Sequence, residues 1–394
     1  MKIFRYVTAA AAALLMLLAY GLPASAFHEG GVAHCDGCHT MHNSVDGQQV
    51  IANPGSNLLT ASDASSSCLG CHAGSGRFRI LSDNGSNFTP GGDFFWQTVD
   101  ISWVVRGNTV VRKGYENGHS IVAADFPILQ PEQDLATAPG GSFPAAILGC
   151  QSCHDPHGVK VNKTGPIVGS GSFGDPEPAV GELGNYRILG DVGYRPTGSG
   201  VTFVNSPMIA VALPDGDPNE TDDHHADYGS GSSEWCANCH AGLQVAGTGV
   251  TKHPNGNTVK LGEYVSNYNN YRATGEFGPG SGINFNNAYF ALVPIERGTT
   301  DNQNLSIAST QGAVDGQSNV TCLSCHRAHN SAFKYGTRWD QTTELLVDSH
   351  PQAGDTVSRS DAATLQLNSY YGRTIETAFN EFQRSLCNKC HHKD

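Results

Sequence analysis

Apolar residues are unevenly distributed along the chain and form few regular patterns. One continuous apolar run, from Val7 to Tyr20, lies near the N-terminus. Apolar side chains at helical spacing form one stripe over positions 261–271 and a second over positions 375–386, which ends in the last cysteine motif. Val and Ile cluster within positions 101–111, which predicts short strands. Elsewhere no period is evident, so we expect mostly irregular loops with short α-helices and little β-structure.

The N-terminal apolar run is typical of a secretory signal. Lys2 and Arg5 precede it, and Ala24–Ala26 follows it as a small-residue cleavage site. A membrane anchor is the alternative, but a bilayer needs about 20 apolar residues and this run is shorter. We therefore expect residues 1–26 to be a cleaved signal peptide, and residues 27–394 to be exported as a single elongated domain without a transmembrane segment.

Composition narrows the choice of function. Charged residues make up 15% of the 394 positions, against about 25% in an ordinary soluble domain, and 47 residues are glycine. The formal net charge of −13 argues against a nucleic-acid partner, because phosphate binding needs a basic surface. So few apolar stripes indicate that something besides side-chain packing organises the fold. The 12 cysteines and 17 histidines indicate what that is.

All the cysteines fall into six copies of the pattern C-x-x-C-H, which is the attachment signature of c-type haem. On one helical turn these residues share a face, so the two thiols reach the haem vinyl groups while the histidine ligates the iron. The cysteines of motifs one to six are Cys35 and Cys38, Cys68 and Cys71, Cys150 and Cys153, Cys236 and Cys239, Cys322 and Cys325, and Cys387 and Cys390. The proximal iron ligands that follow them are His39, His72, His154, His240, His326 and His391.

Two other uses of paired cysteines have to be weighed against haem attachment. An exported chain can carry a disulfide framework, and repeated C-x-x-C pairs can bind zinc. Neither alternative explains why a histidine follows the second cysteine in all six motifs, or why no cysteine is left over. We therefore predict six covalently bound haem c groups that organise the chain around them.

The second axial ligand of each iron separates an electron carrier from an enzyme. Of the four methionines only Met41 and Met208 lie outside the signal segment, which is too few for six irons. Seventeen histidines less the six proximal ones leave eleven, enough for two histidines on every iron. Bis-histidine ligation also implies lower potentials than methionine–histidine ligation.

Three of the remaining histidines, His42, His157 and His329, each lie three residues after a proximal histidine. Side chains at positions i and i+3 point the same way from a helix, so the two cannot approach one iron from opposite sides. Each of the three would therefore ligate a different haem from the one that its own motif binds.

Three further histidines, His28, His119 and His253, are the next candidates. The latter two lie in loops rich in glycine and asparagine, where the backbone can bend around a macrocycle. The other five are not assigned a role. Two of them adjoin motif residues, and the pair in the acidic turn is expected to be solvated; in chain order the five are His34, His224, His225, His350 and His392.

The motifs in their context resemble the OmcS-type hexahaem cytochromes, outer-surface proteins of metal-reducing bacteria that polymerise into conductive filaments. The resemblance covers nearly the whole exported chain and is carried by Phe27-His28, Gly30–Ala33, Gly37–Ser44, Thr89–Phe94, Cys153–Gly158, Tyr186–Gly190, Ser233–His240, Cys322–His329 and Leu386–His391. It implies loops and short helices around a continuous chain of six stacked haems. It also implies distal iron ligands at His28, His42, His119, His157, His253 and His329.

The same resemblance implies an assembly and a function. The histidine that matches His42 ligates a haem of the next subunit, which makes a head-to-tail homopolymer. Such a filament would carry electrons from other multihaem cytochromes to extracellular acceptors such as metal oxides, and it would not be an enzyme. Two alternatives remain open: a monomeric periplasmic electron shuttle, and a multihaem reductase with an open axial position on one iron.

If the haems organise the chain, the haem-free chain should be largely unfolded. We expect haem-free protein to show little regular structure by circular dichroism and to be degraded faster than haem-loaded protein in limited proteolysis. A compact, protease-resistant apo form would contradict this expectation.

Overall fold

The computed structural model describes residues 35–40, 42–45, 48–52, 58–74, 78–157, 185–211, 219–222, 224–244, 253–273, 276–277, 289–300, 305 and 314–391. The expected signal peptide, His28, His34, Met41 and His392 lie outside these ranges. The helices of the described part are α2 (Cys35–Cys38), α3 (Ala64–His72), α4 (Ser232–His240), α5 (Val265–Asn270), α6 (Cys322–Cys325), α7 (Ala362–Ser369) and α8 (Ile375–Ala378). Most of the described chain between them is loop or short 3₁₀ turn.

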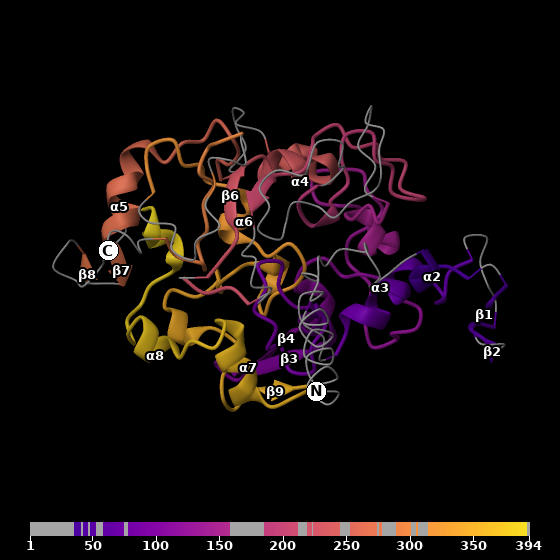
Figure 1. Ribbon diagram of the computed structural model, residues 1–394. Coiled ribbons are helices and arrows are strands. Elements are labelled where there is room, and N and C mark those ends of the chain that lie inside the picture. The colour runs from indigo at the N-terminus through magenta and orange to yellow at the C-terminus, as the bar shows by residue number, and fades with distance from the viewer. Residues whose placement is uncertain are drawn as a thin grey trace, which may run out of the picture.

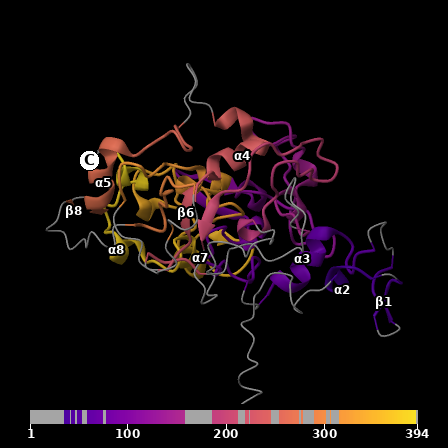
Figure 2. The ribbon, with the colours of Figure 1, turned by 45° about the horizontal axis from the view of Figure 1, so that its top comes forward.

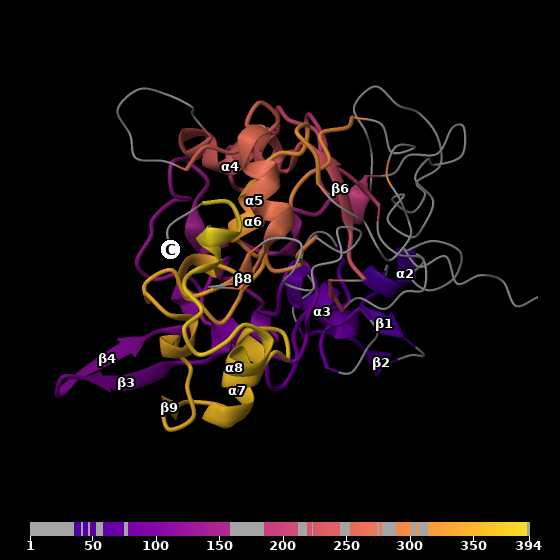
Figure 3. The same cartoon turned by 90° about the vertical axis from the view of Figure 1, so that its left-hand side faces the viewer.

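The strands are equally short. They are β1 (Ser44–Val45), β2 (Gln48–Gln49), β3 (Ile101–Val105), β4 (Asn108–Arg112), β5 (Ile209–Val211), β6 (Asp227–Ser230), β7 (Tyr271–Ala273), β8 (Glu276–Phe277) and β9 (Thr356–Val357). They pair antiparallel as β1-β2, β4-β3-β9, β5-β6 and β7-β8. The hairpin of β3 and β4 projects from the body of the molecule (Figure 3) and lies where Val and Ile predicted strands. The prediction of loops, short helices and little sheet is therefore confirmed.

The N-terminal and C-terminal motifs lie at different ends of the molecule. In Figure 1 and Figure 2, α2 and β1 lie at one end, while α5, α8 and the C-terminus lie at the other. The second to fifth motifs lie between these ends, on α3, α4, α6 and the 3₁₀ turn Cys150–Ser152. Among the described residues, no helix has the length and apolar character needed to cross a membrane.

Two of the longer helices begin at an acidic N-cap. The Asp63 carboxylate accepts from the Ser66 N–H at the start of α3 (2.7 Å), and Asp361 accepts from Thr364 in the same way at the start of α7 (2.9 Å). At the start of α4 the buried Glu296 carboxylate caps the helix instead, accepting from the Ser232 N–H at 2.7 Å. Side chains therefore cap the helices that carry the second and fourth motifs.

The side-chain core is larger than the apolar patterns predicted. Buried apolar residues form a large cluster that runs from Leu69 to Leu386 and includes Trp96, Trp339 and Tyr370, and a smaller one around Tyr228. Many of them lie in loops and 3₁₀ turns such as Phe94–Thr98, where five consecutive residues are buried. Residues in such segments follow neither the helical nor the strand period, so periodicity could not reveal them.

The two helical stripes have different outcomes. The first is confirmed as helical: a 3₁₀ turn leads into α5, and Leu261 and Tyr268 are buried. Tyr264 of the same stripe is exposed, and the buried Tyr271 already belongs to β7. The second does not continue as a helix into the last motif, because α8 ends at Ala378. Asn380 has a φ of 145°, and its side-chain oxygen accepts from the Phe382 N–H at 2.9 Å, which turns the chain out of the helix.

Candidate functional site

Four of the six motifs pack against one another in a repeated way. Ser65 of α3 lies three residues before the second motif, and its hydroxyl accepts from the Cys150 N–H of the third motif at 3.1 Å. Ser233 of α4 lies three residues before the fourth motif, and its hydroxyl accepts from the Cys322 N–H of the fifth motif at 3.0 Å. The second and third motifs therefore form one pair, and the fourth and fifth motifs form an equivalent pair.

The cysteines of these pairs are close together as thiols. A hydrogen bond from the thiol partner, together with burial, raises the pKa of Cys68 beside Cys150 and of Cys236 beside Cys322. The ten cysteines from Cys68 to Cys390 form no disulfide. The described residues also contain no cluster of three or more His, Cys, Asp or Glu side chains that could hold a bare metal ion.

Four proximal histidines each face a histidine from a distant part of the chain. The ring centroids are 6.3 Å apart for His39 and His157, 6.2 Å for His154 and His329, 5.9 Å for His240 and His119, and 6.0 Å for His391 and His253. A metal–imidazole bond is about 2 Å long, so two imidazoles on opposite sides of one metal ion have centroids about 6 Å apart. Each pair therefore fits a single bis-histidine iron.

Backbone carbonyl groups fix the orientation of these rings. Six histidines of the site donate from Nδ1 to a carbonyl: His72 to Phe78 (2.9 Å), His119 to Ala328 (2.7 Å), His154 to Arg187 (2.9 Å), His240 to Pro139 (2.8 Å), His253 to Pro254 (2.8 Å) and His326 to Tyr335 (3.0 Å). A carbonyl can only accept, so the hydrogen of the neutral ring is on Nδ1. The lone pair of Nε2 is then available to an iron.

Burial keeps several of these rings neutral. It lowers the pKa of His119 to about 4 and that of His329 to about 3, and neighbouring histidines add to both effects. Burial also lowers the pKa of His154. At neutral pH these imidazoles are uncharged, which is the form that binds a metal.

The candidate distal ligands of the third and fourth motifs share one short ladder. His119 donates its N–H to the His329 carbonyl at 3.0 Å, and the Ser331 N–H donates to Asn117 at 3.1 Å. His329 is also stacked on Phe94, with centroids 4.6 Å apart. Because both rings project from this ladder, the third and fourth sites are neighbours in space.

The four pairs follow one rule along the chain. His157, three residues after the third motif, faces the proximal histidine of the first motif. His329, three residues after the fifth motif, faces that of the third. His119, which precedes the third motif, faces the proximal histidine of the fourth motif. His253, which precedes the fifth motif, faces that of the sixth. The unit of the third and fourth motifs and that of the fifth and sixth therefore follow one pattern: each places one histidine opposite a proximal histidine of its own and one opposite a proximal histidine of the preceding unit.

The remaining predicted ligands are not paired by the described residues. His42 is exposed beside β1 and faces none of the described proximal histidines. The ring of His326 likewise faces no second histidine within the described ranges, although its Nδ1 is held by Tyr335. The remaining candidate for the second motif, His28, lies outside those ranges.

Two unassigned histidines have structural contacts instead. His225 was expected to be solvated, which is wrong: its ring is 3% exposed and is stacked on Tyr289 at 3.9 Å. His350 is stacked on Trp103 at 4.3 Å, and its Nδ1 is 2.8 Å from the Asp355 carboxylate.

Sequence reasoning missed the serines and glycines that position the site. A signal was present, since Ser65 and Ser233 hold the same place relative to their motifs, and a serine precedes the second cysteine in both the third and the fifth motif. Those two serines, Ser152 and Ser324, accept from the N–H groups of Gly149 and Thr321 (3.0 and 3.1 Å). Similarity between alternate motifs is therefore a mark of the paired packing.

Comparisons with known proteins agree with this arrangement. No protein-family model matches the sequence. The C-type cytochrome OmcS of Geobacter sulfurreducens is 38% identical to this chain, over 98% of each protein. Two solved structures from that organism, OmcS nanowires and an outer membrane cytochrome S filament, are 36% and 37% identical to it. Both superpose with a TM-score of 0.78 over 93% of this chain and 100% of theirs.

The ladder between His119 and His329 gives a test of the site. Gly118 has a φ of 140°, and a Cβ atom there would overlap with the His329 carbonyl oxygen. We expect Gly118→Ala to separate the two strands and to convert two of six haems from low-spin to high-spin, as measured by visible absorption and electron paramagnetic resonance.

A second glycine provides the matched control. Gly107 at the tip of the β3–β4 hairpin also has a positive φ of 82°, but no atom lies within 4 Å of the position that a Cβ atom would take there. Gly107→Ala should therefore keep all six haems low-spin. A Gly118→Ala protein with six low-spin haems would show that this ladder does not hold the ligands.

Proposed function

This chain belongs to the family of the C-type cytochrome OmcS, and from that premise we propose that it carries electrons outside the cell along a filament of head-to-tail copies. The chain is a six-haem c-type cytochrome with one C-x-x-C-H motif for each haem. The observation that supports the carrier role is the set of four histidine pairs with ring centroids 5.9–6.3 Å apart. Two histidines on one iron leave no axial position for a substrate, which disfavours a reductase.

The proposal assigns the six haems their ligands. Each haem is bound by the two cysteines of its motif and by the histidine that follows them. The distal ligands are His157 for the first motif, His28 for the second, His329 for the third, His119 for the fourth, His42 of another copy for the fifth, and His253 for the sixth. Four of these pairings rest on ring geometry, and those of His28 and His42 rest on the repeat rule.

Haem, when bound, supplies the one-electron chemistry. The chain contributes the geometry around it. Backbone carbonyls hold the rings in the tautomer that leaves Nε2 for the iron, and burial keeps the imidazoles neutral. The serine contacts between α3 and the third motif, and between α4 and the fifth, keep neighbouring sites at fixed separations. A rigid ligand set of this kind needs little rearrangement when an electron arrives or leaves.

The repeat rule also supports the polymer. By this rule His42, which follows the first motif, ligates the haem of the motif two places before the first. One copy of the chain has no such motif. The fifth motif of another copy takes that place, because the rule otherwise leaves His326 without a second ligand. One copy then donates a ligand that the next copy accepts through a different surface. A heterologous contact of this kind builds an open filament instead of a closed ring.

The cellular setting is part of the same proposal. The related structures are filaments by their names, and one is described as an outer membrane cytochrome. We propose that this chain works at the outer surface, takes electrons from other multihaem cytochromes and delivers them to extracellular acceptors such as metal oxides. Wild-type protein that stays monomeric under all conditions would instead favour a periplasmic shuttle.

Replacement of His42 tests the filament. His42→Ala should abolish filaments in electron micrographs and leave one of six haems high-spin, because the fifth motif then lacks its second ligand. His42→Met should return that haem to the low-spin state with a raised potential, since methionine is also a haem ligand.

His350 supplies the control, because it is a histidine engaged with Trp103 and Asp355. His350→Gln should keep both the filaments and six low-spin haems. Filaments with six low-spin haems in the His42→Ala protein would refute ligation between copies.

A further inference from the structure

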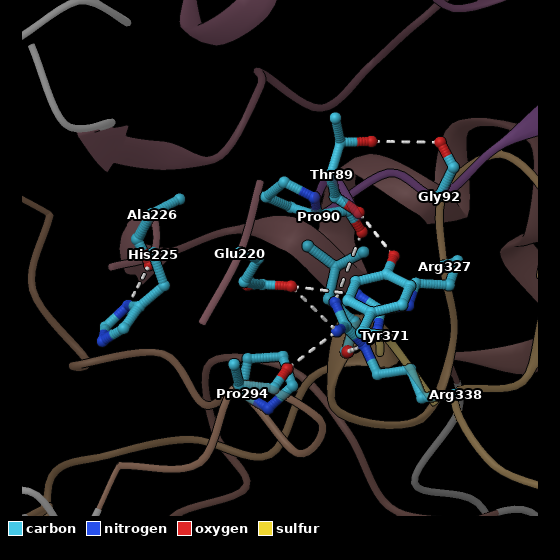
Figure 4. A network of polar contacts seen from close by, with 12 residues as sticks. Thr89, Pro90, Gly92, Glu220, His225, Ala226, Pro294, Arg327, Arg338 and Tyr371 are labelled. Atoms are coloured by element: carbon cyan, nitrogen blue, oxygen red, sulfur yellow. Dashed lines mark hydrogen bonds and ion pairs between the residues drawn. The ribbon is translucent and has the colours of Figure 1, made fainter. Parts of the chain in front are cut away.

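A buried cluster of charged residues consists of Glu220, Arg327 and Arg338 (Figure 4). The Glu220 carboxylate is 2.9 Å from the Arg327 guanidinium and 3.3 Å from that of Arg338. The exposed fractions of the three residues are 2%, 3% and 1%. Two guanidinium groups share one carboxylate, so the cluster carries one positive charge that it does not balance itself. Buried charges are poorly screened by solvent and act over a longer range than surface charges.

Arg338 links this cluster directly to the motif. Its Nε donates to the carbonyls of Leu323 at 2.6 Å and of His326 at 3.1 Å. Leu323 is part of α6, and His326 is the proximal histidine that ends it. Arg327 is the next residue in the chain. The unbalanced charge is therefore attached to the backbone of the residue that would hold the iron of the fifth motif.

The other contacts of the two arginines are with neutral groups. The Arg327 guanidinium lies 3.5 Å from the ring centre of Tyr371, whose hydroxyl donates to the Thr89 carbonyl. Arg338 also donates to the carbonyls of Ala291 (2.9 Å) and Pro90 (3.5 Å). Burial and the charge of Arg338 lower the pKa of Arg327 to about 10, which leaves it charged at neutral pH.

Neither of the nearby titratable groups His225 and Asp93 forms an ion pair with the cluster among the described residues. Burial lowers the pKa of His225, so that ring is neutral at pH 7. The buried Asp93 carboxylate accepts from Ser82, Asn87 and Phe95, and among the described residues it pairs with neither arginine.

We propose that the Glu220–Arg327–Arg338 cluster raises the reduction potential of the haem bound by the fifth motif. Reduction places an additional electron on that haem, and a fixed positive charge nearby stabilises the reduced form. The inference rests on the six-haem part of the proposed function and not on filament formation. If the fifth motif also forms the junction between copies, the cluster sets the potential at which electrons cross that junction.

Charge variants of opposite sign separate this electrostatic role from a purely structural one. Glu220→Gln removes the negative charge and should raise the midpoint potential of one haem in six. Arg327→Gln removes a positive charge and should lower it. The double variant Glu220→Gln/Arg327→Gln restores the original net charge and should return the potential close to that of the wild type. Loss of packing alone would not produce shifts of opposite sign or their cancellation.

The measurement is a redox titration of haem-loaded protein, followed by visible absorption. A unit charge at roughly 10 Å in a medium of effective dielectric constant about 20 changes an equilibrium by tenfold or more. We therefore expect each single variant to change the ratio of reduced to oxidised fifth-motif haem by about tenfold at the wild-type midpoint, which corresponds to about 59 mV for one electron.

Further variants keep the test decisive. Arg327→Lys keeps the charge and should keep the potential. Lys113→Gln removes an exposed cation paired with Asp100 and should leave all six haems unchanged. Shifts of the same sign in both single variants, or no shift in variants with six low-spin haems, would overturn the proposal. If either Glu220→Gln or Arg327→Gln fails to load six haems, the remaining single variant and Arg327→Lys decide whether the proposal holds.

The outcome is also separable from that of the filament test. Wild-type protein without filaments but with these shifts would refute the conduit and leave the inference intact. Filaments in which both single variants have the same haem potentials as the wild type would refute only the inference.

Discussion

The requirement that two imidazoles face one iron, with ring centres about 6 Å apart, governs the rest of this structure. Each C-x-x-C-H motif can supply only one of the two rings, so every site needs a histidine from another part of the chain. His157 comes to the first motif and His329 to the third, each from the motif two places further along. These long-range pairings order the loops between them. Few extended helices or sheets are then needed, and the described part of the chain contains only short ones.

Much of the site could be predicted from the sequence, because C-x-x-C-H joins chemistry to a fixed local spacing. The i, i+3 position of His157 and His329 also excluded ligation of their own haems, and the observed ring pairs agree with that exclusion. Which distant motif each histidine meets depends on tertiary contacts, such as that between Ser233 and Cys322, that no local pattern encodes.

The same limit applies to the core and to the unassigned histidines. Trp96 and Trp339 are buried in irregular segments without a period, and Asn380 ends a stripe whose apolar residues alone suggested a longer helix. His225 lies in a run of acidic residues, yet packing against Tyr289 buries it. Buried charge is equally invisible in the sequence: Glu220 is more than one hundred residues from Arg327, and only the fold brings them together.

The central claim is the repeat rule, by which each two-motif unit gives one histidine to itself and one to the unit before it. A cryo-electron microscopy reconstruction of the native filament, at a resolution that shows axial ligands, tests it most directly. We predict density that joins His42 of one copy to the iron at the fifth motif of the next, and His28 to the iron at the second motif of its own copy. A fifth-motif iron ligated by a histidine of its own copy would contradict the rule.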